Sequence, residues 1–402
     1  MISIKAIQVR LKKESTMAVL ATIVLYLTLL AFAGGIGTRE WYVDENIFIP
    51  TVKLFYDHPT VATLKTYPEI PGPLSFIMYA AWAKAVGFST FKLRLFSMLL
   101  AGTVFYLIFS IVRQEAESTI KGYLAMLLSM ANPYMAGLSV FVFTDMAMLF
   151  FMLLAYRAFS RSSPVPLFFY MAGALLCRQY AGILYGALLL FTGLRWWKKR
   201  QKRDIPLFFA ILPSLLPLAG LFVLWGGIAP QAGFRKYVGN FKPKFGNYLV
   251  FYIATWWVYL LPVIIWKAKT LYGGRRPWIA GFAAAALYPL FPVTVSEWTK
   301  ADSCCTTNGY LHRMIRTATG GGTAEHMIFA LLFFFGCRLL LQMGIESLRA
   351  VRDGRIRRPL LNDLLFAAFL LLMPLQYQVW EKYLVMVLPF VMFRFFRKAA
   401  VQ

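Results

Sequence analysis

The sequence predicts an all-α integral membrane protein whose surface is mostly in contact with lipid. Of its 402 residues, 59% are hydrophobic, 17% are aromatic and only 15% are charged, and the mean hydropathy is +0.62. Soluble domains carry roughly 25% charged residues, so this chain has too few polar side chains to cover a water-exposed surface. Long apolar runs separated by short basic clusters complete the pattern.

The apolar runs are long enough to cross a hydrocarbon core of ~30 Å, which takes roughly 20 helical residues. The first run follows several basic residues, and Ala31-Phe32-Ala33 resembles a signal-peptide cleavage site, but the length of the run favours a retained helix. We predict about 12 transmembrane helices. They lie at residues 17–35, 91–112, 119–136, 139–158, 164–179, 180–195, 205–227, 248–267, 278–296, 325–342, 360–376 and 384–397.

The basic residues indicate how the chain is oriented. A formal net charge of +25 could suggest nucleic acid, but the basic residues gather in every second turn between apolar runs, as in cytoplasmic loops. The pattern therefore predicts a cytoplasmic N-terminus, an external face that is periplasmic or lumenal, and no nucleic-acid partner. The basic turns contain Arg113 and Lys121; Arg157 and Arg161; residues 195–203; residues 267–276; residues 349–358; and the tail from Arg394.

Residues 36–90 form the one long segment predicted outside the membrane near the N-terminus. It opens with Asp44-Glu45 and continues through the Pro-rich stretch Tyr67–Pro73. Residues 74–88 are apolar but too short and too interrupted for a span, so we expect a helix lying in the membrane interface.

Two acidic sites on the external side are candidates for chemistry. Asp44 and Glu45 could act on an acceptor hydroxyl as a general base, or they could be two solvated loop carboxylates. Asp145 lies about two turns inside the outer end of the predicted helix 139–158, where a carboxylate is costly and usually functional. The alternative to a functional role is that Asp145 is a structural carboxylate, which points into a water-filled vestibule or bonds to a neighbouring helix end.

External cations are the second group of candidates. Arg178-Gln179 lies at the apex between two short spans, and Glu381-Lys382 precedes the last one. An arginine at headgroup level suits a phosphate, although such cations also snorkel to lipid headgroups. The loop 297–323 could be a mobile lid; within it we expect His312 to be a surface residue, and Gly320–Gly322 is a weak phosphate-loop signal because no Gly-Lys-Ser/Thr follows.

No metal or cofactor is expected. The four cysteines, at positions 177, 304, 305 and 337, have no zinc spacing and no disulfide framework. The chain also has no dinucleotide-binding segment and no Asp-x-Asp motif.

Short stretches in a consistent order resemble the GT-C glycosyltransferases, and most of all the dolichyl-phosphoglucose α-1,2-glucosyltransferases. The resemblance covers roughly residues 40–230 and 375–397. It departs from that family in lacking a His in the segment after Asp44, and in lacking the family's His-Pro-Tyr and Asn-Arg-His-Tyr elements. The stretches are Asp44–Pro50, Pro71–Leu74, Leu93–Phe96, Asn132–Tyr134, Phe143–Asp145, Cys177–Gln179, Trp225–Ile228, Glu381–Leu384 and Leu388–Arg394.

The resemblance implies a GT-C fold with a catalytic module at 1–230, which includes the external loop 36–90, and a C-terminal transmembrane module at 231–402. It implies an inverting hexosyltransferase, glucose favoured, that uses a polyprenyl- or dolichyl-phosphate sugar and a glycan, lipid or protein acceptor. Asp44 would be the base and Glu45 would orient hydroxyls. The donor would be bound by Asp145, Arg178, Gln179, Glu381 and Lys382.

Three alternatives remain open from the sequence. The first is a mannosyl- or aminoarabinosyl-type transferase of the protein mannosyltransferase and lipid A class, also GT-C. The second is a lipid or sugar transporter, which predicts broken helices and repeat symmetry at the bilayer midplane. The third is a structural membrane subunit. The membrane is that of a bacterial cell or of the endoplasmic reticulum.

Overall fold

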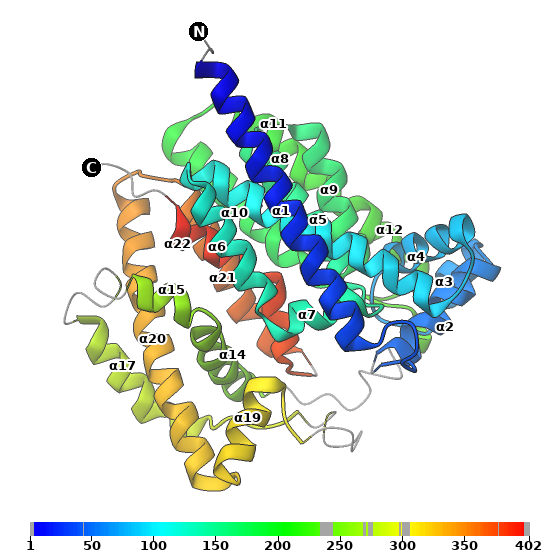
Figure 1. Cartoon of the computed structure of the whole chain (residues 1–402). Helices are drawn as coiled ribbons and strands as arrows, with labels where there is room; N and C mark the ends of the chain where they lie inside the picture. Colours follow the sequence, from blue (N-terminus) through cyan, green and yellow to red (C-terminus); the bar gives the residue numbers. More distant parts are fainter. Residues whose placement is uncertain are drawn as a thin grey trace. The chain divides into compact units, whose positions relative to one another are not determined.

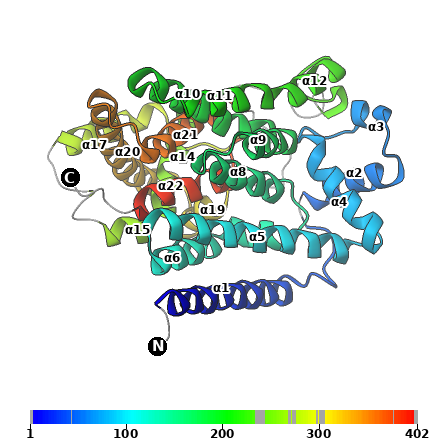
Figure 2. The same ribbon diagram turned by 90° about the horizontal axis from the view of Figure 1, so that it is seen from above.

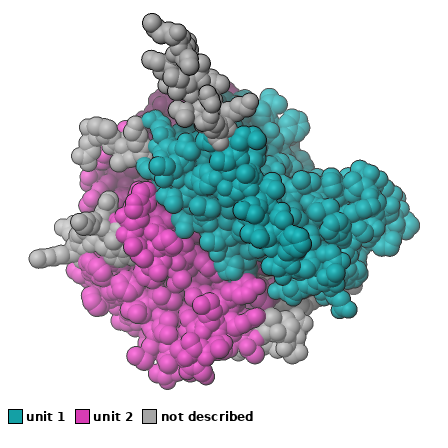
Figure 3. All heavy atoms as spheres, in the orientation of Figure 1, with its two compact units in different colours: residues 1–181, 209–234, 396–402 teal, residues 182–208, 235–395 magenta. Residues whose placement is uncertain are grey.

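The protein is all-helical in the part described by the computed structural model. The described residues are 4–42, 44–233, 244–267, 271, 276–296, 299, 306–376 and 378–397, and they contain no β-strand. The predicted all-α class is therefore confirmed. The chain forms two compact units, coloured separately in Figure 3. Unit 1 comprises Met1–Ala181, Phe209–Phe234 and Phe396–Gln402, and unit 2 comprises Gly182–Phe208 and Arg235–Phe395. The predicted division of the chain near residue 230 stays a prediction.

Unit 1 is built around the long helix α5, which packs against α1, α4, α6, α7 and α8. Helices α8 and α9 pack together, and α2 lies on α4 in a small helical cluster (Figures 1 and 2). The unit contains α1 (Ile4–Gly34), α2 (Glu45–Asp57), α3 (Val61–Thr66), α4 (Pro73–Val86), α5 (Thr90–Ala116), α6 (Thr119–Met130), α7 (Pro133–Val140), α8 (Asp145–Ser160), α9 (Pro164–Cys177), η1 (Gln179–Ala181), η2 (Leu212–Leu215) and α12 (Leu216–Trp225). Helix α11 (Asp204–Ile211) contains the boundary between the units.

Unit 2 is organised around α20, which packs against α14, α17 and α21. The backbone of α14 comes so near that a Cβ on Gly336 would lie 2.7 Å from the carbonyl oxygen of Ile253. The unit contains α10 (Gly182–Lys199), α14 (Phe245–Tyr259), α15 (Leu261–Trp266), α17 (Arg276–Leu287), η3 (Tyr288–Leu290), α19 (Tyr310–Thr319), α20 (Gly322–Arg352), α21 (Arg358–Leu372), η4 (Met373–Leu375), η5 (Glu381–Met386) and α22 (Leu388–Phe396).

The apolar helices coincide with the predicted spans. Within the described residues, five helical segments are long and apolar enough to cross a membrane: Ser15–Gly34, Thr90–Ala116, Asp204–Trp225, Gly322–Arg352 and Arg358–Leu375. The chain is thus a multi-pass membrane protein, while the number of about 12 spans stays a prediction. Residues 164–195 form two helices, α9 and α10, separated by η1, as predicted.

The predicted spans 119–136 and 139–158 differ from the structure. Helix α6 ends at Met130. The side chain of Asn132 then caps α7 by accepting hydrogen bonds from the amides of Tyr134 and Met135 at 3.0 and 3.1 Å. Helix α8 begins only at Asp145. Helices α7 and α8 meet at an angle of 107°. Pro133 favours the start of α7, because proline is best tolerated in the first turn of a helix.

The segment 36–90, which the sequence predicts to be external, is largely helical. It contains α2, α3 and α4, and the helix expected at 74–88 is present as α4. Its position at a membrane interface stays a prediction.

Candidate functional site

Glu45 is completely buried and forms an ion pair with Arg94. The Nε and Nη2 atoms of Arg94 donate to the two carboxylate oxygens at 3.0 and 2.7 Å, and the side chains are 0% and 1% exposed. The backbone amides of Tyr42 and Val142 donate to the same carboxylate at 2.8 and 2.9 Å. Glu45 therefore joins the entry to α2, the helix α5 and the α7–α8 break.

Arg94 has no unused donor in this arrangement. Its remaining hydrogen bonds go to the carbonyl oxygens of Ile36, Arg39 and Glu40, at 2.8 to 3.0 Å. An arginine side chain has five N–H donors, and all five are used. The geometry gives Glu45 the role of a structural anchor for the segment after α1. The role expected for it, orienting substrate hydroxyls, is not supported by a carboxylate so fully engaged.

Asp145 lies at the start of α8, not two turns inside a helix. It occupies the first helical position after Thr144, and its side chain is 5% exposed. The expectation was wrong because the apolar run 139–158 contains a break at 141–144 that hydropathy does not reveal. The pair Thr144-Asp145 is itself a helix-start signal, since threonine is favoured at the N-cap and an acidic residue in the first turn complements the helix dipole.

Asp145 holds Arg178 through an ion pair. Nη2 of Arg178 donates to Oδ2 of Asp145 at 2.8 Å, and Nε donates to the hydroxyl of Thr144 at 2.7 Å. The hydroxyl of Tyr180 donates to the other oxygen of Asp145. Arg178 follows the last residue of α9 in an extended conformation, so the end of α9 meets the beginning of α8 through a buried guanidinium–carboxylate pair.

Helix α2 borders this pair. The guanidinium carbon of Arg178 lies 5.9 Å from the centre of the Phe48 ring, and Phe48 also contacts Phe143 edge-on, with ring centres 6.1 Å apart. The amide of Phe48 bonds the carbonyl oxygen of Asp44 at 2.9 Å. Asp44 has helical φ and ψ values, so it lies one turn before Phe48 on the same face of α2. Its side chain is half-buried. The structure thus brings Asp44, Glu45, Asp145 and Arg178 to one part of unit 1.

The Pro-rich stretch is fixed against the same helix end. Nε2 of Gln179 donates to the carbonyl oxygen of Ile70 at 2.7 Å, and a Cβ on Gly72 would lie 2.1 Å from the carbonyl oxygen of Leu176. Gly72 is required at this point because any side chain would collide with backbone. Gln179 therefore holds the Pro-rich stretch of segment 36–90, a role that the sequence did not indicate.

Glu381 and Lys382 belong to unit 2. The Glu381 carboxylate is 0% exposed and accepts hydrogen bonds from the hydroxyl of Tyr259 at 2.7 Å and from the amides of Leu311 and His312 at 3.1 and 2.9 Å. These amides are in the first turn of α19, so Glu381 caps that helix. Lys382 is half-buried, with Nζ 5.9 Å from the centre of the Tyr383 ring. Donor binding by either residue stays a prediction.

His312 is buried, so the expectation of a surface histidine was wrong. Its Nδ1 accepts from the amide of Asn308 at 3.1 Å, which leaves the proton on Nε2, 2.9 Å from Glu325. Arg316 pairs with the same carboxylate at 2.8 Å. Burial lowers the pKa of His312, while the carboxylate of Glu325 opposes that shift. Gly320, Gly321 and Gly322 have φ values of 69°, 82° and 69°, so the triple glycine makes the turn between α19 and α20. Lys300, Cys304 and Cys305 lie outside the described residues.

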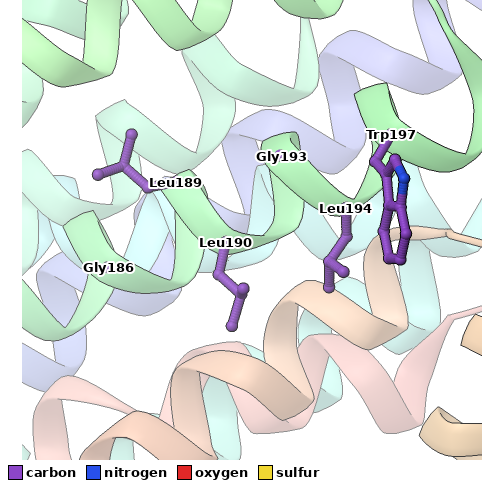
Figure 4. A pocket seen from close by; sticks show the side chains of 6 residues that line it. All are labelled: Gly186, Leu189, Leu190, Gly193, Leu194 and Trp197. Carbon is purple, nitrogen blue, oxygen red and sulfur yellow. The ribbon is translucent and has the colours of Figure 1, made fainter.

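The rest of the described chain adds no metal-binding cluster. No group of three or more His, Cys, Asp or Glu side chains there could hold a metal ion. An open groove of about 490 Å³ runs along α10 and is lined by leucines, glycines and Trp197 (Figure 4). It contains no titratable side chain and so has no acid–base chemistry of its own.

Three residues of the cluster had no role predicted from the sequence, namely Arg94, Thr144 and Tyr180. Arg94 and Thr144 were inside the quoted stretches but had no assigned role. A buried arginine in an apolar helix requires a carboxylate partner, and this rule would have indicated Arg94 as structurally important without naming Glu45.

Comparisons with known proteins give a faint likeness. No protein-family model matches the chain, and no curated protein matches it. It is similar to the crystal structure of ArnT from Cupriavidus metallidurans in the apo state, with 14% identity, a TM-score of 0.43 and coverage of 96% of this chain and 78% of that one. It is also similar to the crystal structure of the same protein bound to undecaprenyl phosphate, with 13% identity, a TM-score of 0.44 and coverage of 94% of this chain and 77% of that one. Similarities this low carry no functional argument.

Proposed function

We propose that this protein is a GT-C-type glycosyltransferase that moves a sugar from a polyprenyl-phosphate donor to an acceptor hydroxyl on the external side of the membrane. One observation carries the proposal: the buried Asp145–Arg178 pair lies against the face of α2 that begins with Asp44. A carboxylate and an oriented guanidinium near one helix are the two groups that such a transfer requires, a base for the nucleophile and a cation for the leaving phosphate.

The proposed reaction is a single displacement. Asp44 takes the proton of the acceptor hydroxyl while the hydroxyl oxygen attacks the anomeric carbon of the sugar. The bond between that carbon and the phosphate oxygen breaks, and the lipid phosphate leaves with the electron pair. Arg178 stabilises the charge that develops on the phosphate, and the configuration at the anomeric carbon is inverted.

The contacts of Arg178 suit this task. Asp145 and Thr144 fix the plane of the guanidinium group through separate hydrogen bonds, so the group needs little reorganisation when the phosphate forms. Asp145 is at the N-terminus of the 16-residue helix α8, whose dipole adds positive potential at the same place. Helix dipole and guanidinium together favour an anion there.

The other candidates take supporting roles in the proposal. Glu45 anchors the entry to α2 and Gln179 anchors the Pro-rich stretch, so both position Asp44 and Arg178 without contacting substrate. Glu381 holds the first turn of α19. Lys382 is proposed to contact the donor phosphate, and this assignment rests on the sequence alone.

The sugar can be a hexose, with glucose favoured by the sequence resemblance, or an aminopentose such as aminoarabinose. A polyprenyl-phosphate donor is proposed because it reaches the site through the bilayer. The acceptor is a glycan, a lipid or a protein.

The test is sugar transfer by the purified protein in detergent, with synthetic polyprenyl phosphates that carry glucose, mannose or aminoarabinose. We expect transfer with one donor, and loss of at least 100-fold in turnover for Asp44→Asn. The matched control is Glu40→Gln, which removes an exposed carboxylate from the same loop and should leave turnover unchanged. Turnover of Asp44→Asn near that of the unmodified protein would remove Asp44 as the base.

The same assay distinguishes the other classes. A transporter or a structural subunit would leave every radiolabelled donor unconsumed in detergent, where there are no compartments to move it between. Transfer of label to an acceptor would exclude both.

A further inference from the structure

The turn between α20 and α21 contains a second cavity, which is lined by charged side chains, unlike the apolar groove along α10. Its volume is about 310 Å³, and the charged side chains that line it are Glu346, Arg349, Arg355 and Arg357. This volume is at the small end of the range of ligand sites, which is roughly 300–1,000 Å³. Three guanidinium groups around one small space repel one another unless an anion lies between them.

The carboxylate in the cavity is already neutralised. Oε2 of Glu346 pairs with Arg394 at 2.7 Å, and Oε1 accepts from Gln342 at 2.7 Å. Arg394 makes a further ion pair with Asp363 at 2.6 Å. Glu346 is thus held by groups outside the lining of the cavity, and the three arginines dominate the charge in it.

Two of the arginines, Arg349 and Arg357, have no carboxylate partner among the described residues. Arg355 pairs with the exposed Asp353 at 2.6 Å. Among the residues that the structure describes, no carboxylate pairs with the guanidinium group of Arg349 or Arg357. Arg357 is also the N-cap residue of α21, and its side chain does not cap that helix. Two exposed guanidinium groups therefore face the cavity beside a helix N-terminus, a combination that favours an anion.

The position of the cavity identifies the source of the anion. The turn joins two segments that can each cross a membrane, Gly322–Arg352 and Arg358–Leu375. A turn between two spans lies at the level of the lipid headgroups, and this one is on the side predicted to be cytoplasmic. Basic pockets between transmembrane helices on that side bind anionic headgroups.

We propose that the cavity binds the phosphate of an anionic phospholipid, with Arg349 and Arg357 as its ligands and Arg355 in support. This site would hold the α20–α21 turn at the inner membrane surface, independently of the sugar transfer proposed above.

The experiment is native mass spectrometry of the purified chain with phosphatidylglycerol or phosphatidylcholine. We expect the chain to retain phosphatidylglycerol selectively. Its affinity for this lipid should fall about fivefold for each arginine removed, and so about 25-fold in the double variant Arg349→Gln with Arg357→Gln. The matched control is Arg352→Gln, which removes a charge from the same turn but not from the lining, and it should retain the lipid.

Three outcomes would overturn the proposal: equal retention of both lipids, equal retention by the double variant and the control, or binding of inorganic phosphate as tight as that of phosphatidylglycerol. Both arginines are exposed, so the double variant should fold, and an unchanged melting temperature checks this. Sugar-transfer activity is measured separately from lipid binding. The proposed function and the proposed lipid site can therefore fail independently of each other.

Discussion

Glu45 and Arg94 show how a single ion pair can organise a segment of a membrane protein. Both side chains are buried, and the pair has hydrogen bonds to five backbone groups in addition to its own two. Two charges removed from water are stable only when their hydrogen-bonding capacity is filled in this way. The entry to α2, and with it Asp44, depends on this pair.

The first prediction concerns that pair. Glu45→Ala leaves the guanidinium of Arg94 buried without its counterion, so we expect a loss of about 3–5 kcal/mol in the free energy of unfolding. Denaturant unfolding in detergent would measure it. The double variant Glu45→Leu with Arg94→Met removes both charges and should be more stable than Glu45→Ala. A single variant as stable as the unmodified protein would contradict the structural role.

The second prediction concerns the geometry of Arg178. Lysine keeps the positive charge but cannot donate to Thr144 and Asp145 through a planar fork. We expect Arg178→Lys to fold and to lower kcat/KM for sugar transfer by about 10²–10³-fold, the usual cost of removing a donor aimed at a developing charge. Arg161→Lys, at the opposite end of α8, is the control and should keep its activity. Equal activity of the two variants would show that charge alone suffices.

At the scale of elements, the break between α7 and α8 determines where the candidate residues lie. The amide of Val142 donates to Glu45 instead of continuing a helix, and Thr144 and Asp145 hold Arg178. The four residues between the helices thus connect to both buried ion pairs. A continuous helix over 139–158 would have placed Asp145 within the span, without access to the end of α9.

The third prediction concerns the contact between the Pro-rich stretch and α9. In Gly72→Ala the new Cβ would lie 2.1 Å from the carbonyl oxygen of Leu176, so the segment must shift, at a cost of about 1–3 kcal/mol in stability. Gly137→Ala is the control, because nothing lies within 4 Å of a Cβ there. Thermal unfolding of both variants tests the contact, and equal melting temperatures would show that the stretch is not held against α9.

At the scale of the whole molecule, the basic turns predict the orientation in the membrane. The proposed reaction requires residues 41–72 on the external side, opposite the turns rich in arginine and lysine. The cavity at the α20–α21 turn requires the cytoplasmic side. Both proposals therefore depend on the same topology.

The fourth prediction tests that topology. In a cysteine-free background, a cysteine at exposed His58 should react with a membrane-impermeant maleimide added to intact cells, and one at exposed Lys202 should react only after the membrane is opened. Lys202 is the internal control for membrane integrity. Labelling of position 58 only after lysis would place α2 in the cytosol and end the proposed function.

The sequence by itself determined the membrane class, the positions of most of the long apolar helices and the long polar-rich segment before α5, because hydropathy and charge act along the chain and need no partner. It also singled out Asp145 and Arg178 as ionisable groups at unusual places. Only the tertiary structure decided that these two pair with each other, that Glu45 belongs to Arg94, 49 positions away, and that His312 is buried. The reason is physical. A charge buried in an apolar protein must find an opposite charge, but packing between distant helices selects which one, and no local pattern records that choice.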